Sequence, residues 1–429
     1  MQAFAALGLA TLVAVTAGTS NMSSEQTIPA RPMTGAWRAT VMGDQGGAPI
    51  PFGLIVHRDG AEWRAEIQNA GELIPVRMTV DADEFRIDLD PYQSWIEGTI
   101  ESLGTAMYGQ WIRPRGNRPT VKMSFAAKHG TPDRFPDLTE PDEYDPKIDG
   151  RWTVKFQGDQ EPSVGVFETR GQRVHGTFLT TLGDYRFLDG EFNGKALELS
   201  CFDGAHAFLF SATLQDDGSL KGTFQSRDSY FDSWTARRDP NAKVLDPFEL
   251  TTVDPDAKWG DLAFPDLQGK TRRLDDIAFA GKARILTLFG SWCPNCTDHA
   301  KYMHELQTTY GERGLSILGL AFEYDDEPAE QIARIRNWQT RLGVDHPILL
   351  GGPADKQRAH KAFPILSAVR AYPTTIFIDG NGRIDSIHTG FSGPATGKTH
   401  ERLRDAFESR IERLLGAPRD DPEQAGSGG

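Results

Sequence analysis

Cysteine is scarce in this chain, with three residues in 429. So few cysteines exclude a scaffold held together by several disulfides, and they leave no second pair for a four-cysteine zinc site. Basic residues are also in the minority, since 46 Lys and Arg stand against 60 Asp and Glu and give a formal net charge of −14. A chain this acidic is not expected to use nucleic acid or an anionic membrane surface as its main partner.

Residues 1–24 contain no charged side chain. The apolar run from Phe4 to Ala17 is shorter than the roughly 20 residues of a membrane-spanning helix and matches the core of a secretory signal. Small residues around Ala17 fit a cleavage site, although no Lys or Arg precedes the run. We therefore predict export to the periplasm or another extracytoplasmic space, with residues 1–24 as a signal peptide or an uncleaved N-terminal anchor.

Two segments, 34–130 and 148–240, carry the signs of antiparallel β-structure. Each holds about eight short stretches in which apolar and polar residues alternate between Gly-rich turns. They open alike, with Gly35-Ala36-Trp37 and Gly150-Arg151-Trp152. Eight strands are enough to close a small barrel. We predict two barrel-like β modules that form an internal repeat, and their Gly-x-Trp opening resembles that of lipocalin- and avidin-like barrels.

Residues 257–416 follow a β/α pattern instead. A continuous apolar strand is predicted over 285–289, a helix over 294–310 and a second buried strand over 315–322. The tail, 417–429, is rich in Gly, Pro and acidic residues and is predicted to be disordered. The predicted fold class is multidomain, with two antiparallel β modules followed by an α/β domain.

Two of the three cysteines lie in Cys293-Pro294-Asn295-Cys296, between the predicted strand and the predicted helix. Thiol–disulfide exchange needs an accessible thiolate and a second thiol within reach of the mixed disulfide. A helix N-terminus favours the thiolate, because its unpaired N–H groups and the helix dipole stabilise negative sulfur. Pro294 suits the first helical position, since it has no N–H to leave unpaired. We predict Cys293 as the nucleophile and Cys296 as the resolving thiol.

Two other interpretations of the cysteine pair have less support. A zinc site would need a second Cys/His pair, and His299 on the same helix is the nearby candidate. A purely structural disulfide would not need a strand before it, a helix after it and Trp292 beside it. The third cysteine, Cys201, shares strand parity with apolar residues and is predicted to face the core of the second β module. The sequence therefore favours a redox-active dithiol that uses no metal or cofactor.

Residues from about 258 to 416 resemble the exported TlpA/ResA-like thiol–disulfide oxidoreductases, which have a thioredoxin-like fold. The resemblance implies that the Tyr372–Pro373 bond is cis and that Pro373 faces the cysteine pair. A proline there has no N–H, which leaves the neighbouring backbone free to pair with a substrate strand. Four segments carry the resemblance: Ser291-Trp292-Cys293-Pro294-Asn295-Cys296, Phe264-Pro265-Asp266-Leu267-Gln268-Gly269-Lys270, Ala371-Tyr372-Pro373-Thr374-Thr375-Ile376-Phe377-Ile378-Asp379 and Gly390-Phe391.

The chain departs from this family beside the second cysteine. The family commonly has Glu three residues after it, where this chain has His299. Histidine titrates near neutrality, so His299 is predicted to carry the proton released when Cys296 attacks, and a histidine without a role is the alternative. Glu323, after the predicted strand 315–322, is a second candidate acid. Four further residues are predicted to support the site: Trp292, Pro294, Asn295 and Tyr372.

The resemblance implies an enzyme that reduces protein disulfides and receives electrons from a thiol donor, with a membrane-bound donor as one candidate. Two alternatives stay open. A peroxiredoxin-type peroxidase would have Thr three residues before its reactive cysteine, where Gly290 stands. A binding protein would use the β modules as its functional part, through a partner or a small ligand.

Overall fold

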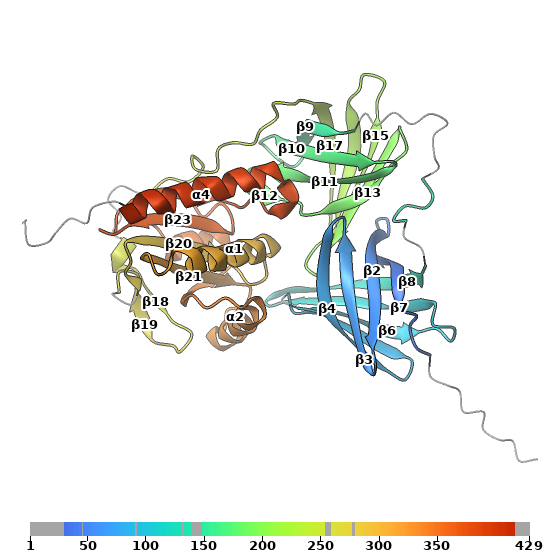
Figure 1. The fold of residues 1–429 in the computed structure, drawn as a ribbon, viewed down its shortest axis with the longest axis horizontal. Coiled ribbons are helices and arrows are strands. Elements are labelled where there is room, and N and C mark those ends of the chain that lie inside the picture. Colours follow the sequence, from blue (N-terminus) through green and yellow to red (C-terminus); the bar gives the residue numbers. More distant parts are fainter. Residues whose placement is uncertain are drawn as a thin grey trace, which may run out of the picture.

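The computed structural model describes residues 30–44, 46–90, 92–130, 133–138, 148–253, 259–276 and 279–416. The chain forms two β-barrels followed by a thioredoxin-like α/β domain (Figure 1). This confirms the fold class predicted from the sequence. The predicted signal or anchor (1–24) and the predicted disordered tail (417–429) lie outside the described residues. In the part of the chain that is described, no helix has the length and apolar character to cross a membrane.

Barrel 1 is built from eight antiparallel strands that pair in sequence order, and β1 also pairs with β8 to close the sheet. Strict alternation sends every second side chain inward, so that Phe85 and Ile87 of β5 are buried. Two tryptophans, Trp37 and Trp111, help to fill the interior. The strands are β1 (Gly35–Met42), β2 (Ile50–Asp59), β3 (Glu62–Asn69), β4 (Glu72–Asp81), β5 (Glu84–Leu89), β6 (Ser94–Ile100), β7 (Ala106–Arg115) and β8 (Arg118–His129).

Barrel 2 closes in a similar way, because β10 pairs with both β9 and β11, and the short β12 is added beside β11. Its core is a cluster of aromatic rings that includes Phe178 and Phe210, stacked with centroids 4.5 Å apart. Cys201 is fully buried in this core, as predicted, and burial raises the pKa of its thiol. The strands are β9 (Gly150–Phe156), β10 (Ser163–Arg170), β11 (Arg173–Thr180), β12 (Gly183–Asp184), β13 (Leu188–Phe192), β14 (Ala196–Phe202), β15 (Ala207–Leu214), β16 (Leu220–Ser226) and β17 (Tyr230–Arg238).

The two barrels begin with the same local arrangement. Trp37 Nε1 donates to the carbonyl of Met33 at 3.0 Å, and Trp152 Nε1 donates to the carbonyl of Ile148 at 2.9 Å, four residues upstream in both cases. Two residues before each tryptophan stands a glycine with φ above +100°, a conformation that residues with a Cβ rarely adopt. This shared start supports the internal repeat.

The α/β domain has a five-stranded sheet in the order β22-β21-β20-β23-β24, with helices on both faces. Strands β20, β21 and β22 are parallel, and β23 and β24 are antiparallel to their neighbours. The sequence analysis did not identify β22 and α3. The elements are β18 (Ala263–Pro265), β19 (Thr271–Arg273), β20 (Ala283–Phe289), α1 (Pro294–Tyr310), β21 (Leu315–Glu323), α2 (Pro328–Leu342), β22 (Ile348–Pro353), α3 (Lys356–Ala362), β23 (Thr374–Asp379), β24 (Ile384–Thr389) and α4 (Lys398–Gly416), with short 3₁₀ turns at η1 (Trp259–Asp261) and η3 (Pro394–Thr396).

Buried contacts join the two barrels to each other. Phe202 of barrel 2 inserts into the core of barrel 1 and stacks on Phe52 at 4.2 Å. Arg134, in the segment between the barrels, pairs with Asp189 of barrel 2 at 2.9 Å and donates to the carbonyl of Pro51 in barrel 1. The described part of this segment therefore places a buried cation between the barrels.

A second buried arginine joins all three parts of the molecule. Arg186 follows β12 and forms ion pairs with Glu72 of barrel 1 at 2.8 Å, Asp203 of barrel 2 at 3.1 Å and Asp298 of α1 at 2.5 Å. Burial alone would lower the pKa of Arg186, but the three carboxylates outweigh it and hold the pKa well above its usual value. The ion pairs fix the barrels against the α/β domain.

Candidate active site

Cys293 occupies the N-cap position of α1, directly after strand β20 and a short turn. Its Sγ accepts a hydrogen bond from the backbone N–H of Cys296 at 3.4 Å, and Pro294 takes the first helical position. Cys296 lies one turn further on and is completely buried, whereas Cys293 is 8 % exposed. Both are free thiols in this structure. The first cysteine is therefore the one that a substrate can reach.

The backbone before Pro373 lies against the reactive sulfur. The Cys293 thiol donates to the carbonyl of Tyr372 at 3.6 Å, and the Tyr372–Pro373 bond is cis, as the resemblance implied. Trp292 holds the other side, because its Nε1 donates to the carbonyl of Phe322 at 2.9 Å and its ring stacks on Tyr324 at 4.3 Å. The structure thus brings the predicted residues Trp292, Cys293, Cys296, Tyr372 and Pro373 together.

Glu323 ends strand β21 and is buried beside the cysteine turn. Its two carboxylate oxygens accept hydrogen bonds from the backbone N–H and the hydroxyl of Ser291, both at 2.8 Å. Burial raises the pKa of Glu323 to about 7, against the lowering effect of these hydrogen bonds. Burial likewise raises the pKa of Cys296, the neighbouring Cys293 sulfur raises it further, and the negative charge of Glu323 adds a smaller rise. The two groups are therefore electrostatically linked.

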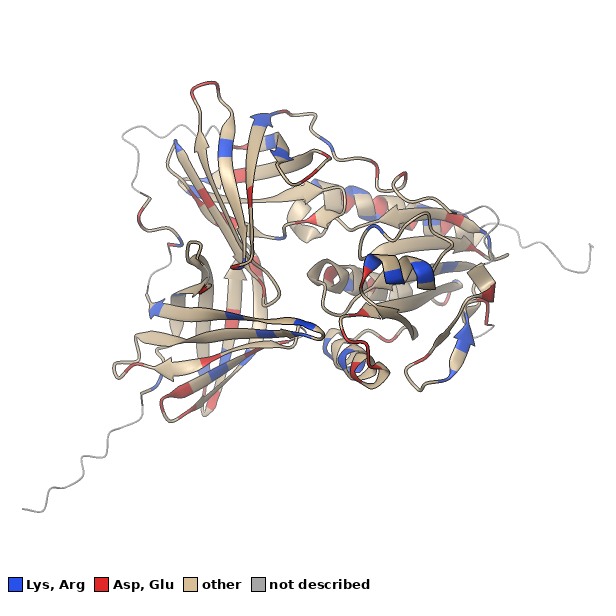
Figure 2. Ribbon diagram, turned by 180° about the vertical axis from the view of Figure 1, so that it is seen from behind, with Lys and Arg blue, Asp and Glu red and all other residues tan. Residues whose placement is uncertain are grey.

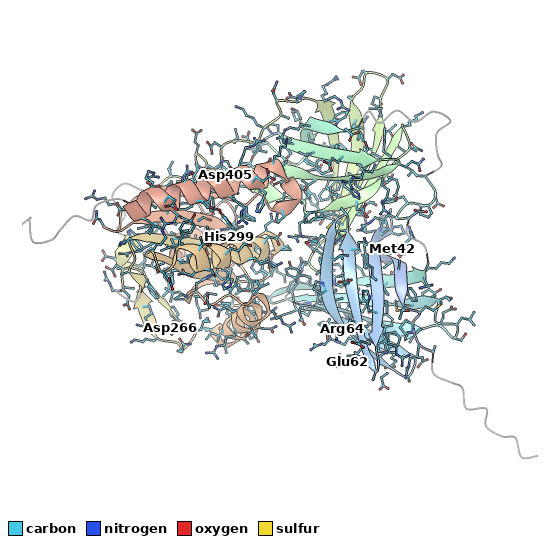
Figure 3. All side chains as sticks on the ribbon, viewed as in Figure 1. Met42, Glu62, Arg64, Asp266, His299 and Asp405 are labelled. Atoms are coloured by element: carbon cyan, nitrogen blue, oxygen red, sulfur yellow. The ribbon has the colours of Figure 1, made fainter. Side chains whose placement is uncertain are left out.

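His299 differs from the sequence-based expectation. It lies on α1 and is labelled in Figure 3, and its side chain is only 1 % exposed. Its Nε2 lies 2.9 Å from the Thr375 hydroxyl, and its ring packs edge-on against Phe391. Burial lowers the pKa of His299 to about 3, so the imidazole is neutral at pH 7. The prediction that this histidine titrates near neutrality is wrong, because burial disfavours the charged imidazolium.

The barrels add residues to the site that the sequence analysis did not single out. Arg113 of β7 donates through Nη2 to the carbonyl of Trp292 at 3.0 Å and through Nη1 to the carbonyl of Ala205 at 2.6 Å. Burial lowers the pKa of Arg113 to about 10, which leaves it charged at neutral pH. His206 of barrel 2 lines the same cavity as Cys293. These residues are far from the CxxC motif in sequence, and no local pattern marks them.

Comparison with known proteins gives matches to the C-terminal domain. The model of the AhpC/TSA family matches residues 255–387. The thiol-disulfide oxidoreductase ResA of Geobacillus thermodenitrificans is 30% identical over 142 residues, which cover 33% of this chain and 73% of that protein. The thioredoxin-like protein YneN of Bacillus subtilis is 27% identical over 130 residues, which cover 30% of this chain and 68% of that protein.

Solved structures also match over about this length. A thiol:disulfide interchange protein of the thioredoxin family from Chlorobium tepidum has a TM-score of 0.28 at 22% identity, with 38% of this chain and 99% of that chain covered. A secreted disulfide oxidoreductase of Mycobacterium tuberculosis has a TM-score of 0.26 at 13% identity, with 36% and 96% covered. The family model begins after barrel 2, so both barrels lie outside it.

Proposed function

We propose that this chain, which belongs to the ResA family of thiol–disulfide oxidoreductases, reduces disulfide bonds with the dithiol of Cys293 and Cys296. One observation carries the proposal: the sulfur of Cys293 lies at the start of α1, 3.4 Å from the N–H of Cys296 and 3.6 Å from the carbonyl before the cis proline. This geometry supports attack from one sulfur and resolution by the other.

The reaction has two exchanges. The Cys293 thiolate attacks one sulfur of the substrate, the substrate S–S bond breaks, and the departing half takes up a proton. Cys296 then loses its proton and attacks the Cys293 sulfur, which releases the second half of the substrate as a thiol. Two electrons pass to the substrate, and the Cys293–Cys296 disulfide remains. A separate thiol donor must reduce that disulfide before the next cycle.

We assign acceptance of the Cys296 proton to Glu323 rather than His299. A general base works best when its pKa lies near the working pH, which the raised pKa of Glu323 satisfies and the lowered pKa of His299 does not. A cavity of ≈ 10 Å³ borders Glu323, Trp292 and Arg113 and is just large enough for one water molecule. The cavity gives the Glu323 carboxylate a neighbouring site for water, although neither cysteine lines it.

The Glu323→Gln variant tests this assignment. In the wild type, we expect the rate of the second exchange to rise through pH 7, because the carboxylate that accepts the proton forms only above its pKa of about 7. The variant should lose this rise and be slower at pH 7.5 by on the order of a hundredfold. Stopped-flow release of the second thiol between pH 5.5 and 8.5 measures both effects. An unchanged pH profile in the variant would remove Glu323 from the mechanism.

The same variant should also change the pH dependence of stability. Below pH 4.5 the carboxyl is protonated in both states, and between pH 4.5 and 7 only the folded state keeps the proton. The contribution of Glu323 to wild-type stability should therefore fall as pH rises through this window, by roughly 3 kcal/mol in all. Glu323→Gln has no titrating carboxyl at this position, so its free energy of unfolding, measured as a function of pH, should lack this fall.

Export and the direction of electron transfer are part of the proposal. Export rests on the uncharged apolar segment within residues 1–24, and the reducing direction rests on the family resemblance. Equilibrium redox titration of the whole protein against glutathione tests the direction. A potential near or below about −250 mV supports a reductase, and one near about −120 mV would mark an oxidant instead.

A further inference from the structure

The exposed side of Cys293 opens into a cavity of ≈ 440 Å³ to which both barrels and the α/β domain contribute. Its wall includes four arginines, and we call it the arginine cavity. Hairpin β7–β8 of barrel 1 supplies Arg113, Arg115 and Arg118, and barrel 2 supplies Arg227 after β16. Figure 2 shows Lys and Arg in blue at the end of this hairpin, where barrel 1 reaches the α/β domain. The volume suits a small molecule.

Hairpin β11–β12 of barrel 2 covers the protein surface on one side of Cys293. A Cβ on Gly183 would lie 2.4 Å from the Asn295 amide nitrogen, and a Cβ on Gly390 would lie 2.5 Å from the carbonyl oxygen of Leu182. The carboxylate of Asp184 accepts from the N–H of Gly393 at 2.6 Å. The turn therefore touches Asn295, one of the two residues between the cysteines, and the segment after β24.

Hairpin β7–β8 of barrel 1 covers the other side. Asn117 Nδ2 donates to the Asp326 carboxylate at 2.6 Å, and the guanidinium of Arg118 lies over the Tyr324 ring at 4.2 Å. Both hairpins therefore contact the α/β domain near Cys293, and the ion pairs of Arg186 hold both barrels there. We infer that a substrate reaches Cys293 through the arginine cavity, which Cys293 lines.

The electrostatics of the cavity differ from those of the whole chain, which carries a formal net charge of −14. The Nε atoms of Arg113 and Arg227 are buried and have no hydrogen-bond partner among the described residues. Asp184 also lines the cavity, but the N–H groups of Gly393 and Arg186 bind its carboxylate. The positive charges of the four arginines that line the cavity with Cys293 suit an incoming carboxylate.

We propose that the arginine cavity selects small anionic disulfides, with carboxylates near the S–S bond, over the disulfides of folded proteins. This inference rests on the proposed function and names its substrate class. The reaction consists of the same two thiol–disulfide exchanges. A compound such as 3,3′-dithiodipropionate is reduced to two thiols, while Cys293 and Cys296 are oxidised to a disulfide. A thiol donor then restores the dithiol.

The test compares three small disulfides that differ in charge: 3,3′-dithiodipropionate (anionic), 2-hydroxyethyl disulfide (neutral) and cystamine (cationic). Each is mixed with the reduced full chain, and the second-order rate constant is divided by that of the same compound with 2-mercaptoethanol. We expect the corrected constants to fall from anionic to cationic by at least about tenfold at low ionic strength, and added salt to reduce the difference. Reduction of insulin, a folded protein, should be slower than that of the dithiodipropionate.

Substitutions locate the effect. Arg227→Gln combined with Arg118→Gln should lower the anionic-to-cationic ratio several-fold, because two of the four charges are gone. Arg113 is left intact, since its backbone hydrogen bonds join barrel 1 to the cysteine turn. The matched control is Arg237→Gln, an exposed residue on β17 whose partner is Asp217. It should leave the ratio unchanged, and circular dichroism checks that each variant is folded.

The outcomes separate this inference from the proposed function. Equal corrected constants for the three compounds, or insulin reduced as fast as dithiodipropionate, would overturn the substrate class while leaving a disulfide reductase. No reaction with any of the four disulfides would overturn the proposed function and the inference together. An equal loss of the ratio in the Arg237→Gln control would show a general charge effect and would also overturn the role of the arginine cavity.

Discussion

Replacement of Cys293 by serine is expected to lower the rate of disulfide reduction by on the order of a thousandfold or more, since a serine hydroxyl at neutral pH does not attack a disulfide. Cys293 is the cysteine whose sulfur borders the arginine cavity, while Cys296 is fully buried. Release of thiol from 2-hydroxyethyl disulfide, followed with the full chain, measures the effect.

The matched variant is Cys296→Ser, which keeps the nucleophile and removes the resolving thiol. It should react once and then stop as a mixed disulfide on Cys293, visible as a mass increase that dithiothreitol reverses. Cys201 offers an internal control, because its burial in barrel 2 should keep it unmodified in both variants. A mixed disulfide on Cys296 in the Cys293→Ser protein would reverse the two roles. Sustained peroxide turnover by Cys296→Ser would favour the peroxidase alternative instead.

Replacement of Arg186 by methionine is expected to have the largest effect on stability, a loss of about 3 to 5 kcal/mol. Methionine fills much of the same space but leaves the buried Asp203 and the largely buried Glu72 and Asp298 without the charge of Arg186. The midpoint of urea unfolding at pH 8 measures the loss. Unpaired buried carboxylates take up protons as pH falls, so the gap between variant and wild type should be smaller at pH 5 than at pH 8.

Two further variants make the Arg186 result specific. Arg237→Met removes an exposed ion pair with Asp217 and should change stability by no more than about 0.5 kcal/mol. Arg186→Lys keeps the positive charge, but its single ammonium group cannot contact three carboxylates as the guanidinium does. Its loss of stability should therefore be intermediate. A change in Arg186→Met as small as that of the exposed control would contradict the view that this arginine holds the three parts of the molecule together.

Most of the fold could be predicted from local patterns in the sequence. The apolar strand before Cys293, the proline at the start of α1 and the spacing of Leu403, Phe407 and Ile411 on α4 are signals within a few residues of each other. For the barrels, the alternation of apolar and polar residues between Gly-rich turns predicted the strands. The spacing of buried residues along α1 also includes His299, three residues from Cys296 and four from Met303, so its burial was readable from the helical period.

The walls of the site could not be read from the sequence. Arg113 meets the carbonyl of Trp292 across 179 residues of chain, and Arg186 meets Glu72 and Asp298 across more than 100 residues on each side. No periodicity links such positions, because they are brought together by how separate domains pack rather than by the geometry of one helix or strand. Arg134 shows the same limit, since its segment has the composition of a linker.

The cysteines that react lie in the α/β domain, whereas the two hairpins that would select the substrate belong to the barrels. Turns at the ends of hairpins change length and composition more freely than core strands. A longer or shorter turn after β7 or β11 would reshape the entrance to the cysteine without altering α1, the cis proline or Glu323. Descendants of one ancestral reductase could in this way acquire new substrates by changing surface turns, while the inherited chemistry of the dithiol stays the same.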